Sequence, residues 1–299
     1  MTTQSPARAY LYLLVATLFF GSNVVAGKLS VGEMSPMAIV MLRWVIAAAC
    51  LAFIARQALL AEWRVLLRRW PYMLAMGGIG FTVFNVMFYA AAHTTSAINM
   101  AIIQGATPIV VLLISGALLG IWPPALQWLG ASITVLGVVV AASHGSLAVL
   151  LELSFNRGDI LMIAASVIYA VYTVGLRWRP QVSPLVFIAG LAFAALLTSI
   201  PLAIGEAALG QFQWPTLKGW ALLLFIGLFP SLLCQLLYLR SVELIGAARA
   251  GVFYNLVPIF GIVLSVAVAH EPLRPYAIVA IALVIGGIAV SEIRKGVRG

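Results

Sequence analysis

Charge is the scarcest property of this chain of 299 residues. Only 8% of the residues are Asp, Glu, Lys or Arg, against about 25% in a typical soluble domain, and 64% are hydrophobic. The apolar residues come in runs of about 20, the length that an α-helix needs to cross the hydrocarbon of a bilayer. These properties exclude a soluble core and predict an all-α polytopic membrane protein.

Carboxylates are especially few, with eight Asp and Glu against 17 Lys and Arg. Each carboxylate falls in a predicted loop or at a span end, whereas intramembrane proton relays usually place one inside the bilayer. Strict proton coupling therefore has no visible carrier residue, and Glu271 beside His270 is only a remote candidate. Facilitated movement down a gradient is the simpler hypothesis.

Clustered His, Asp, Glu and Cys are also missing from the spans, as are a phosphate-binding glycine loop and a soluble nucleotide domain. We therefore expect that the protein is not an enzyme and that it binds neither a metal nor a cofactor. The two cysteines, Cys50 and Cys234, fall in apolar segments and are expected to be buried packing residues. The net charge of +9 is spread between the apolar runs, which excludes a nucleic-acid-binding face.

The apolar runs predict ten transmembrane helices. They lie near residues 10–28, 36–55, 71–92, 97–119, 123–143, 158–177, 184–204, 219–239, 246–269 and 273–292. Residues 1–145 form a first five-helix repeat, 146–157 an outer connecting segment, and 158–299 a second five-helix repeat. With the N-terminus inside, the inner segments hold eleven Lys and Arg and the outer segments four. This bias predicts that both termini are cytoplasmic.

A shift of about 150 positions superposes the two halves. The shift pairs residues of the same kind, namely Gly77 with Gly227, Asn85 with Gln235, Ala97 with Ala247, Pro108 with Pro258, and Gly137 with Gly287. Each half has an odd number of spans, so the two copies must insert in opposite orientations. Inverted-topology repeats with a site between them are typical of membrane carriers.

The clearest duplicated segments are Ala97–Pro108 and Ala247–Pro258. Proline frees a carbonyl four residues earlier, and the carbonyl near Gln104 or Tyr254 could bind an ammonium or amide group. The alternative is that Pro108 and Pro258 only kink the helices while the amides bond neighbouring groups. Because Gln104-Gly105 is replaced by Tyr254-Asn255, we expect the second half to supply more aromatic surface.

Polar and aromatic residues at helical spacing mark further cavity walls at matched depth. These candidates for substrate binding are Phe20 and Asn23 on the first span, Phe81, Asn85 and Tyr89 on the third, Tyr169 and Tyr172 on the sixth, and Gln235 and Tyr238 on the eighth. They join Gln104, Tyr254 and Asn255. Ordinary helix packing is the alternative for the aromatic residues. As a set they suit a ligand with an apolar or aromatic body and a polar head.

Arg43 lies well inside the second span, with no acidic residue in its own helix. Glu33 or a backbone carbonyl is expected to satisfy its charge, giving a structural role, and the alternative is that Arg43 attracts a substrate carboxylate. Close helix approach is expected at small-residue pairs such as Gly137 with Ala141 and Ala282 with Gly286.

Several motifs resemble the drug/metabolite transporter superfamily, specifically its ten-helix EamA-type members. They are Phe20-Gly21-Ser22-Asn23-Val24-Val25-Ala26-Gly27-Lys28, Ser35-Pro36 up to Arg43, Val257-Pro258, and His270-Glu271-Pro272-Leu273. Within the superfamily, the chain looks most like the YddG-type exporters of aromatic and other neutral amino acids. Ile121 departs from the pattern, because the first half lacks an acidic residue matching Glu271.

The resemblance implies a carrier in a bacterial inner membrane that exports small amphipathic metabolites by alternating access. Neutral or aromatic amino acids are the favoured substrates, and the partners are the substrate and the lipid bilayer. A broader drug or metabolite exporter, an importer, and a channel or scramblase remain as alternatives. The sequence carries no signal of oligomeric state.

Overall fold

The structure is a computed structural model that describes residues 6–120, 122, 124–152, 155–246, 250 and 253–292. Those residues form helices joined by short turns, without strands. Eight helical segments are long and apolar enough to cross a membrane, from Ala7–Leu29 to Leu217–Ile245. Two shorter apolar helices follow them. The architecture is that of a multi-pass, all-α membrane protein.

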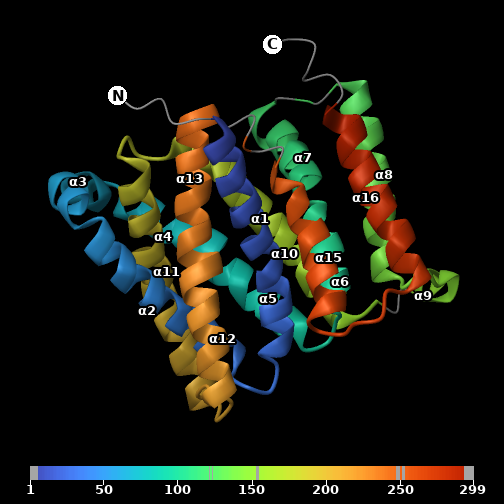
Figure 1. Cartoon of the computed structure of the whole chain (residues 1–299), viewed down its shortest axis with the longest axis horizontal. Helices are drawn as coiled ribbons and strands as arrows, with labels where there is room; N and C mark the ends of the chain where they lie inside the picture. Colours follow the sequence, from blue (N-terminus) through green and yellow to red (C-terminus); the bar gives the residue numbers. More distant parts are fainter. Residues whose placement is uncertain are drawn as a thin grey trace.

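The first half contains the long helices that begin the bundle (Figure 1). Its elements are α1 (Pro6–Leu29), α2 (Pro36–Ile54), α3 (Arg56–Arg68), α4 (Trp70–Gly77), the π-helical segment η1 (Gly78–Val83), α5 (Phe84–Ala92), α6 (Ala97–Gly105), α7 (Thr107–Leu119), α8 (Ala125–Ala142) and the short α9 (Leu147–Leu151). Ser35 precedes α2 with a proline in the first turn, and the Ser96 side chain caps α6. Both are signals that start helices.

The second half follows a similar order. Its elements are α10 (Arg157–Gly175), the 3₁₀ turn η2 (Leu176–Trp178), α11 (Pro184–Ala208), α12 (Leu217–Leu228), the π-helical segment η3 (Phe229–Leu233), α13 (Cys234–Ile245), α15 (Leu256–Ala267) and α16 (Pro275–Glu292). Of the expected segment Ala247–Pro258, residues 247–249 and 251–252 lie outside the described residues.

One helix was not expected from the sequence. The predicted spans near 36–55 and 71–92 leave the residues between them as a connection, but Arg56–Arg68 forms α3, none of whose residues is buried. Leu60 and Trp63 are exposed beside several arginines, and α3 lies toward the end of the bundle where α1 begins (Figure 1). An amphipathic helix of this kind suits the interface between lipid and water.

The backbone irregularities recur about 150 residues apart. The third and eighth spans contain the π-helical segments Gly78–Val83 and Phe229–Leu233. The fourth span breaks at Ala106, and Asn255 forms the turn before α15. Left-handed backbone follows at Gly120 (φ 66°) and at His270 (φ 53°). The duplication seen in the sequence therefore extends to local backbone geometry.

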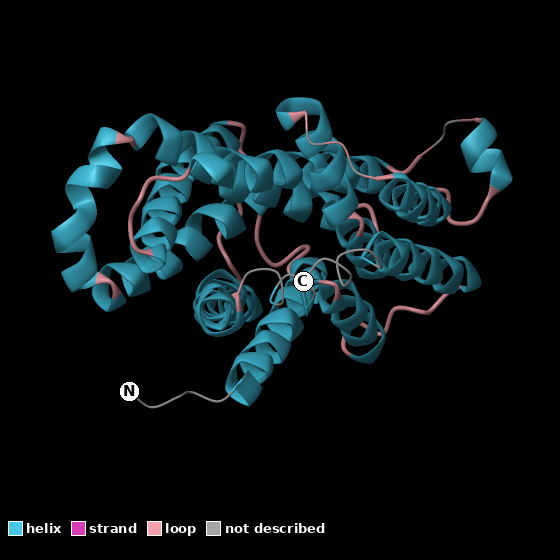
Figure 2. Cartoon of the chain, turned by 90° about the horizontal axis from the view of Figure 1, so that it is seen from above, coloured by secondary structure: helices cyan, strands magenta, loops and turns pink. Residues whose placement is uncertain are grey.

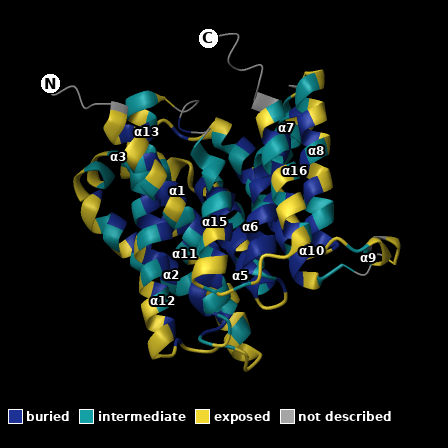
Figure 3. Ribbon diagram, turned by 45° about the vertical axis from the view of Figure 1, so that its right-hand side comes forward, coloured by how far each residue is buried: buried dark blue, intermediate teal, exposed yellow. Residues whose placement is uncertain are grey.

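Equivalent helices of the two halves make equivalent contacts with the opposite half. Helix α1 packs on α13 and α15, and its counterpart α10 packs on α5 and α7. The matched pairs α2 with α11 and α8 with α16 pack on each other, as Figure 1 shows for α8 and α16. Figure 2 shows the same bundle of helices from above. Figure 3 shows buried residues concentrated on α5 and α6, at the centre of the molecule. The two halves therefore meet along all of these helix pairs, with α5 and α6 at the centre.

Close helix approach differs in one detail from the expectation. A Cβ atom on Gly286 would meet nothing within 4 Å, whereas one on Gly287 would lie 2.3 Å from Thr134 Oγ1. On the facing helix, a Cβ on Gly137 would lie 2.8 Å from Val284 Cγ2. The expectation for Gly286 was therefore wrong, because the neighbouring Gly287 is the glycine that faces α8.

Candidate functional site

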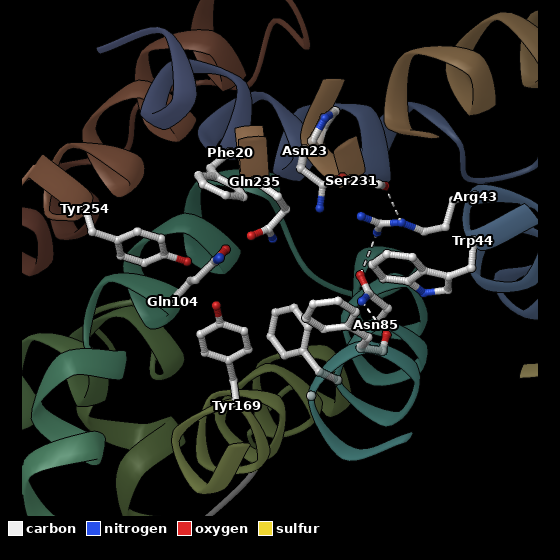
Figure 4. Close-up of a pocket in the computed structure, with 14 residues that line it drawn as sticks. Phe20, Asn23, Arg43, Trp44, Asn85, Gln104, Tyr169, Ser231, Gln235 and Tyr254 are labelled. Atoms are coloured by element: carbon white, nitrogen blue, oxygen red, sulfur yellow. Dashed lines mark hydrogen bonds between the residues drawn. The ribbon is translucent and has the colours of Figure 1, made fainter. Parts of the chain in front are cut away.

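A central pocket lies between the two halves (Figure 4). The first half contributes Phe20, Asn23, Arg43, Trp44, Gly80, Phe81, Phe84, Asn85 and Gln104, and the second half contributes Tyr169, Pro230, Ser231, Gln235 and Tyr254. Its open volume of about 60 Å³ holds a few water molecules and is far below the roughly 300 Å³ of a typical ligand site. An aromatic amino acid enters only if the surrounding helices or side chains move.

Most predicted residues gather in or beside this pocket. Eight of the substrate-binding candidates line it, namely Phe20, Asn23, Phe81, Asn85, Gln104, Tyr169, Gln235 and Tyr254. The other four stand behind or next to the wall. Tyr89 donates its hydroxyl to Asn23, Tyr172 packs on Phe81 and Tyr169, and Tyr238 meets the ring of Tyr254 edge-on. Asn255 lines a smaller adjoining void with Pro108 and Pro258.

Besides these candidates and Arg43, five residues line the pocket: Trp44, Gly80, Phe84, Pro230 and Ser231. Four of them lie in or directly after a π-helical segment. A π-helical turn contains more residues than an α-helical turn, so the face that an α-helical stripe predicts rotates there. Trp44 stacks on Phe81 with ring centroids 4.7 Å apart. The sequence signal that could have identified Trp44 is its position next to Arg43.

The aromatic surface is distributed opposite to the expectation. The first half supplies Phe20, Trp44, Phe81 and Phe84 to the pocket, and the second half supplies Tyr169 and Tyr254. The expectation compared only the segments around Gln104 and Tyr254, whereas α2, η1 and the start of α5 add three of the four rings. The second half contributes hydroxyl-bearing rings instead.

The surroundings of Arg43 also differ from the expectation. Among the described residues, neither Glu33 nor a backbone carbonyl accepts a hydrogen bond from Arg43. The guanidinium donates from Nε to Ser231 Oγ at 2.9 Å, and from Nη1 to Asn85 Oδ1 and Tyr89 Oη at 2.6 Å each. Glu33 instead pairs with Lys218 Nζ at 3.0 Å. A hydrogen bond from Thr216, together with Lys218, holds the pKa of Glu33 below its usual value.

Gln104 presents an unused acceptor between the central pocket and the adjoining void. Its Oε1 atom is buried and has no hydrogen-bond partner in the described part of the chain. Its backbone carbonyl, expected to be freed by Pro108, accepts instead from Thr107 Oγ1 at 2.6 Å. A Cβ on Gly105 would lie 3.1 Å from the Pro258 ring, so the two interrupted spans touch here. The side-chain amide of Gln104, and not its backbone carbonyl, is therefore the group with an acceptor left for a ligand.

Glu271 lies far from the central pocket. Its two carboxylate oxygens accept the N–H groups of Ala97 at 2.8 Å and Ile98 at 3.0 Å, at the N-terminus of α6. Lys28 donates to the carbonyls of Ala92 and Thr95, at the end of α5. These opposite charges match the dipoles of the helix ends that they touch. Glu271 thereby ties the α5–α6 turn in place.

A second cavity of about 340 Å³ opens at this end of the bundle. It is lined by residues that include Lys28, His93, His144, Glu271 and Arg274. Burial and the nearby Lys28 hold the pKa of His93 below its usual value. The cavity therefore carries polar and mostly basic side chains, unlike the aromatic central pocket.

Asp159 is a buried carboxylate whose environment the sequence did not reveal. It lies in the first turn of α10 as expected, but it is 0% exposed. Its Oδ1 accepts from Thr95 Oγ1 at 2.5 Å and from Asn99 Nδ2 at 3.3 Å. His144 Nε2 lies 3.8 Å from Oδ2. The described residues contain no group of three or more His, Cys, Asp or Glu that could hold a metal ion.

Comparison with known proteins adds a family match. The model of the EamA-like transporter family matches residues 7–143 and again residues 156–292. "Uncharacterized transporter YyaM" of Bacillus subtilis (strain 168) is 27% identical over 292 residues, 95% of this chain and 93% of that protein. "Uncharacterized transporter YetK" of the same strain is 26% identical over 289 residues, 96% of this chain and 87% of that protein.

A solved crystal structure of a protein superposes on this chain with a TM-score of 0.66 at 21% identity. The match covers 99% of this chain and 100% of the other. The two chains therefore share a fold.

Proposed function

Because the chain belongs to the EamA-like transporter family, and is a membrane transporter rather than an enzyme, we propose that it carries small amphipathic metabolites through the central pocket. The observation that carries this proposal is the composition of the pocket wall. Aromatic rings and amide groups from both halves converge on one place between them. Such a wall suits a ligand with an apolar body and a polar head.

We propose alternating access as the mechanism, with ten spans arranged as two inverted five-helix repeats. Three kinds of backbone irregularity recur about 150 residues apart, and the family model matches the chain twice. Rocking of one repeat against the other would open the pocket to each side in turn. The pocket volume of about 60 Å³ is consistent with a contracted state between these openings.

Neutral and aromatic amino acids are the favoured substrates, moved outward by facilitated transport. The pocket offers rings that stack on an aromatic side chain, and Gln104 Oε1 offers an unused acceptor for an ammonium group. The YddG-like sequence motifs favour the same substrates and the outward direction. Basic residues concentrated on one side favour an inner-membrane orientation with both termini in the cytoplasm.

The test is a substrate panel on liposomes that contain the purified protein. Saturable flux of aromatic amino acids is expected, and Gln104→Ala should reduce it about tenfold, since a hydrogen bond to a charged group contributes about 1.5–3 kcal/mol. Gln211→Ala, in an exposed loop, is the matched control and should leave the flux unchanged. Asn255→Ala probes the adjoining void and should have a smaller effect.

The panel also separates the alternatives. Flux that rises without saturation would indicate a channel or scramblase. Transport of drug-like cations without any amino acid would indicate a broad exporter and would contradict the proposed substrate class.

A further inference from the structure

Arg43 is a buried cation without a counter-charge. Its exposed fraction is 4%, and no carboxylate forms a salt bridge with it anywhere in the described part of the chain. A guanidinium stays protonated in proteins, and an isolated buried charge is costly unless it is paired. The positive charge of Arg43 is therefore present in the pocket wall and is unbalanced.

The guanidinium also has unused donors. Three of its N–H groups are taken, one on Nε by Ser231 and two on Nη1 by Asn85 and Tyr89. Arginine has five N–H groups in a planar fork. The two on Nη2 have no acceptor among the described residues, and Arg43 lines the central pocket. Figure 4 shows the guanidinium pointing toward Asn23 and Asn85 inside the pocket.

The three partners of Arg43 cannot neutralise it, because each is an uncharged group that keeps its proton and donates it to another acceptor. The Asn85 amide donates to Phe81 O, and the Ser231 hydroxyl donates to Ile226 O. The Tyr89 hydroxyl donates to Asn23 Oδ1. Two of these carbonyls lie in or beside the π-helical segments. The network therefore orients neutral dipoles toward Arg43 and leaves its net charge intact.

A purely structural role would not require a cation. The three acceptors are neutral, and uncharged donors would satisfy them equally well. The ring of Trp44, 5.1 Å from Arg43 Cζ, offers a π face to the cation but no negative charge. What the site lacks is an anion on the Nη2 side of the guanidinium.

We propose that the transported molecule carries a carboxylate, and that this carboxylate binds Arg43 and supplies the missing charge. The inference rests on the proposed function: it restricts the small amphipathic metabolites to those that carry a carboxylate, and it assigns the binding of that carboxylate to Arg43. Figure 4 shows Gln104, with its unpaired Oε1, across the pocket from Arg43. The wall thus presents a cationic donor on one side and a neutral acceptor on the other, which suits an amino-acid zwitterion.

The experiment compares an amino acid with its carboxamide, which lacks only the carboxylate charge, on the purified protein. The probes are an aromatic amino acid, its carboxamide, and the matching carboxylic acid without the ammonium group. Binding is measured directly, by ligand-induced thermal stabilisation, and by competition with the labelled acid in liposomes. The wild-type protein should favour the acid over the carboxamide by about tenfold or more.

Variants assign this preference to Arg43. Arg43→Gln keeps a hydrogen-bond donor without the charge and should bring the ratio of acid to carboxamide affinity to about one. Arg43→Lys should retain part of the preference. Arg240→Gln removes an exposed arginine paired with Glu243 and is the matched control, in which the ratio should not change.

The failures can be told apart. Equal affinity of the wild-type protein for acid and carboxamide overturns the inference without reference to any variant, so misfolding of Arg43→Gln cannot mask the result. A preference that persists in a folded Arg43→Gln also overturns it. Flux of the carboxamide alone overturns the inference but leaves a carrier, whereas no flux of any probe overturns the proposed function as well.

Discussion

At the scale of single residues, two histidines have backbone angles that side chains rarely tolerate. His144 has φ 52° and His270 has φ 53°, both in the left-handed region. At the position matching His270 in the first half, Gly120 has φ 66°. Glycine adopts this geometry without a steric penalty, whereas a Cβ atom costs about 1–2 kcal/mol. The helix end at His270 is therefore strained, whereas the matching helix end of the first half, at Gly120, is not.

His270→Gly should relieve this strain and raise the free energy of unfolding by about 1 kcal/mol. The side chain of His270 is exposed and lines neither cavity, so little else is lost. His93→Gly is the control, since His93 has φ −69°, so glycine relieves no strain there and adds freedom to the unfolded chain. Denaturation in detergent measures both variants, and a loss of stability in His270→Gly would contradict the account.

The sequence identified many individual site residues but not their partners. Polarity and spacing were enough to select Asn85, Gln104 and Arg43, because polar groups inside a span are rare. They could not show that Arg43 meets Ser231 and Tyr89, since that depends on how α2, α5 and η3 are brought together. The burial of Asp159 was hidden for the same reason, because its neighbours come from the turn before α6 and the end of α8.

At the scale of elements, the irregular helices decide which side chains face the pocket. The sequence predicted the breaks near Pro108 and Pro258 from a known rule about proline. It did not predict η1 or η3, because π-helical segments have no comparable signature in these residues. The helical stripes were therefore correct for Phe81 and Asn85 and incomplete for Gly80, Phe84 and Pro230.

The packing of α8 on α16 gives a test at this scale. Gly287→Ala would place its Cβ 2.3 Å from Thr134 Oγ1 and 2.5 Å from Gly130 O. Overpacking of this kind should destabilise the protein by about 1–3 kcal/mol. Gly286→Ala has open space around the new methyl group and should be neutral or slightly stabilising. Thermal unfolding in detergent compares the two, and equal effects would show that these helices are not in close contact.

At the scale of the whole molecule, duplication is the organising feature. A shift of 150 in the sequence predicts the division into halves, and the family model matches residues 7–143 and again 156–292. The positions of the π-helical segments extend that register to the backbone. The pairing of helices across the halves could not be read from the sequence, since apolar helices of similar composition offer many equivalent faces.

The central claim is that the two halves move a carboxylate-bearing molecule by alternating access, and counterflow tests it most directly. Liposomes containing the protein are loaded with an unlabelled aromatic amino acid, and entry of the labelled form is followed without a proton gradient. A carrier that alternates should show faster, saturable entry into loaded than into empty liposomes. Entry that is equally fast in both, and linear in concentration, would contradict the account.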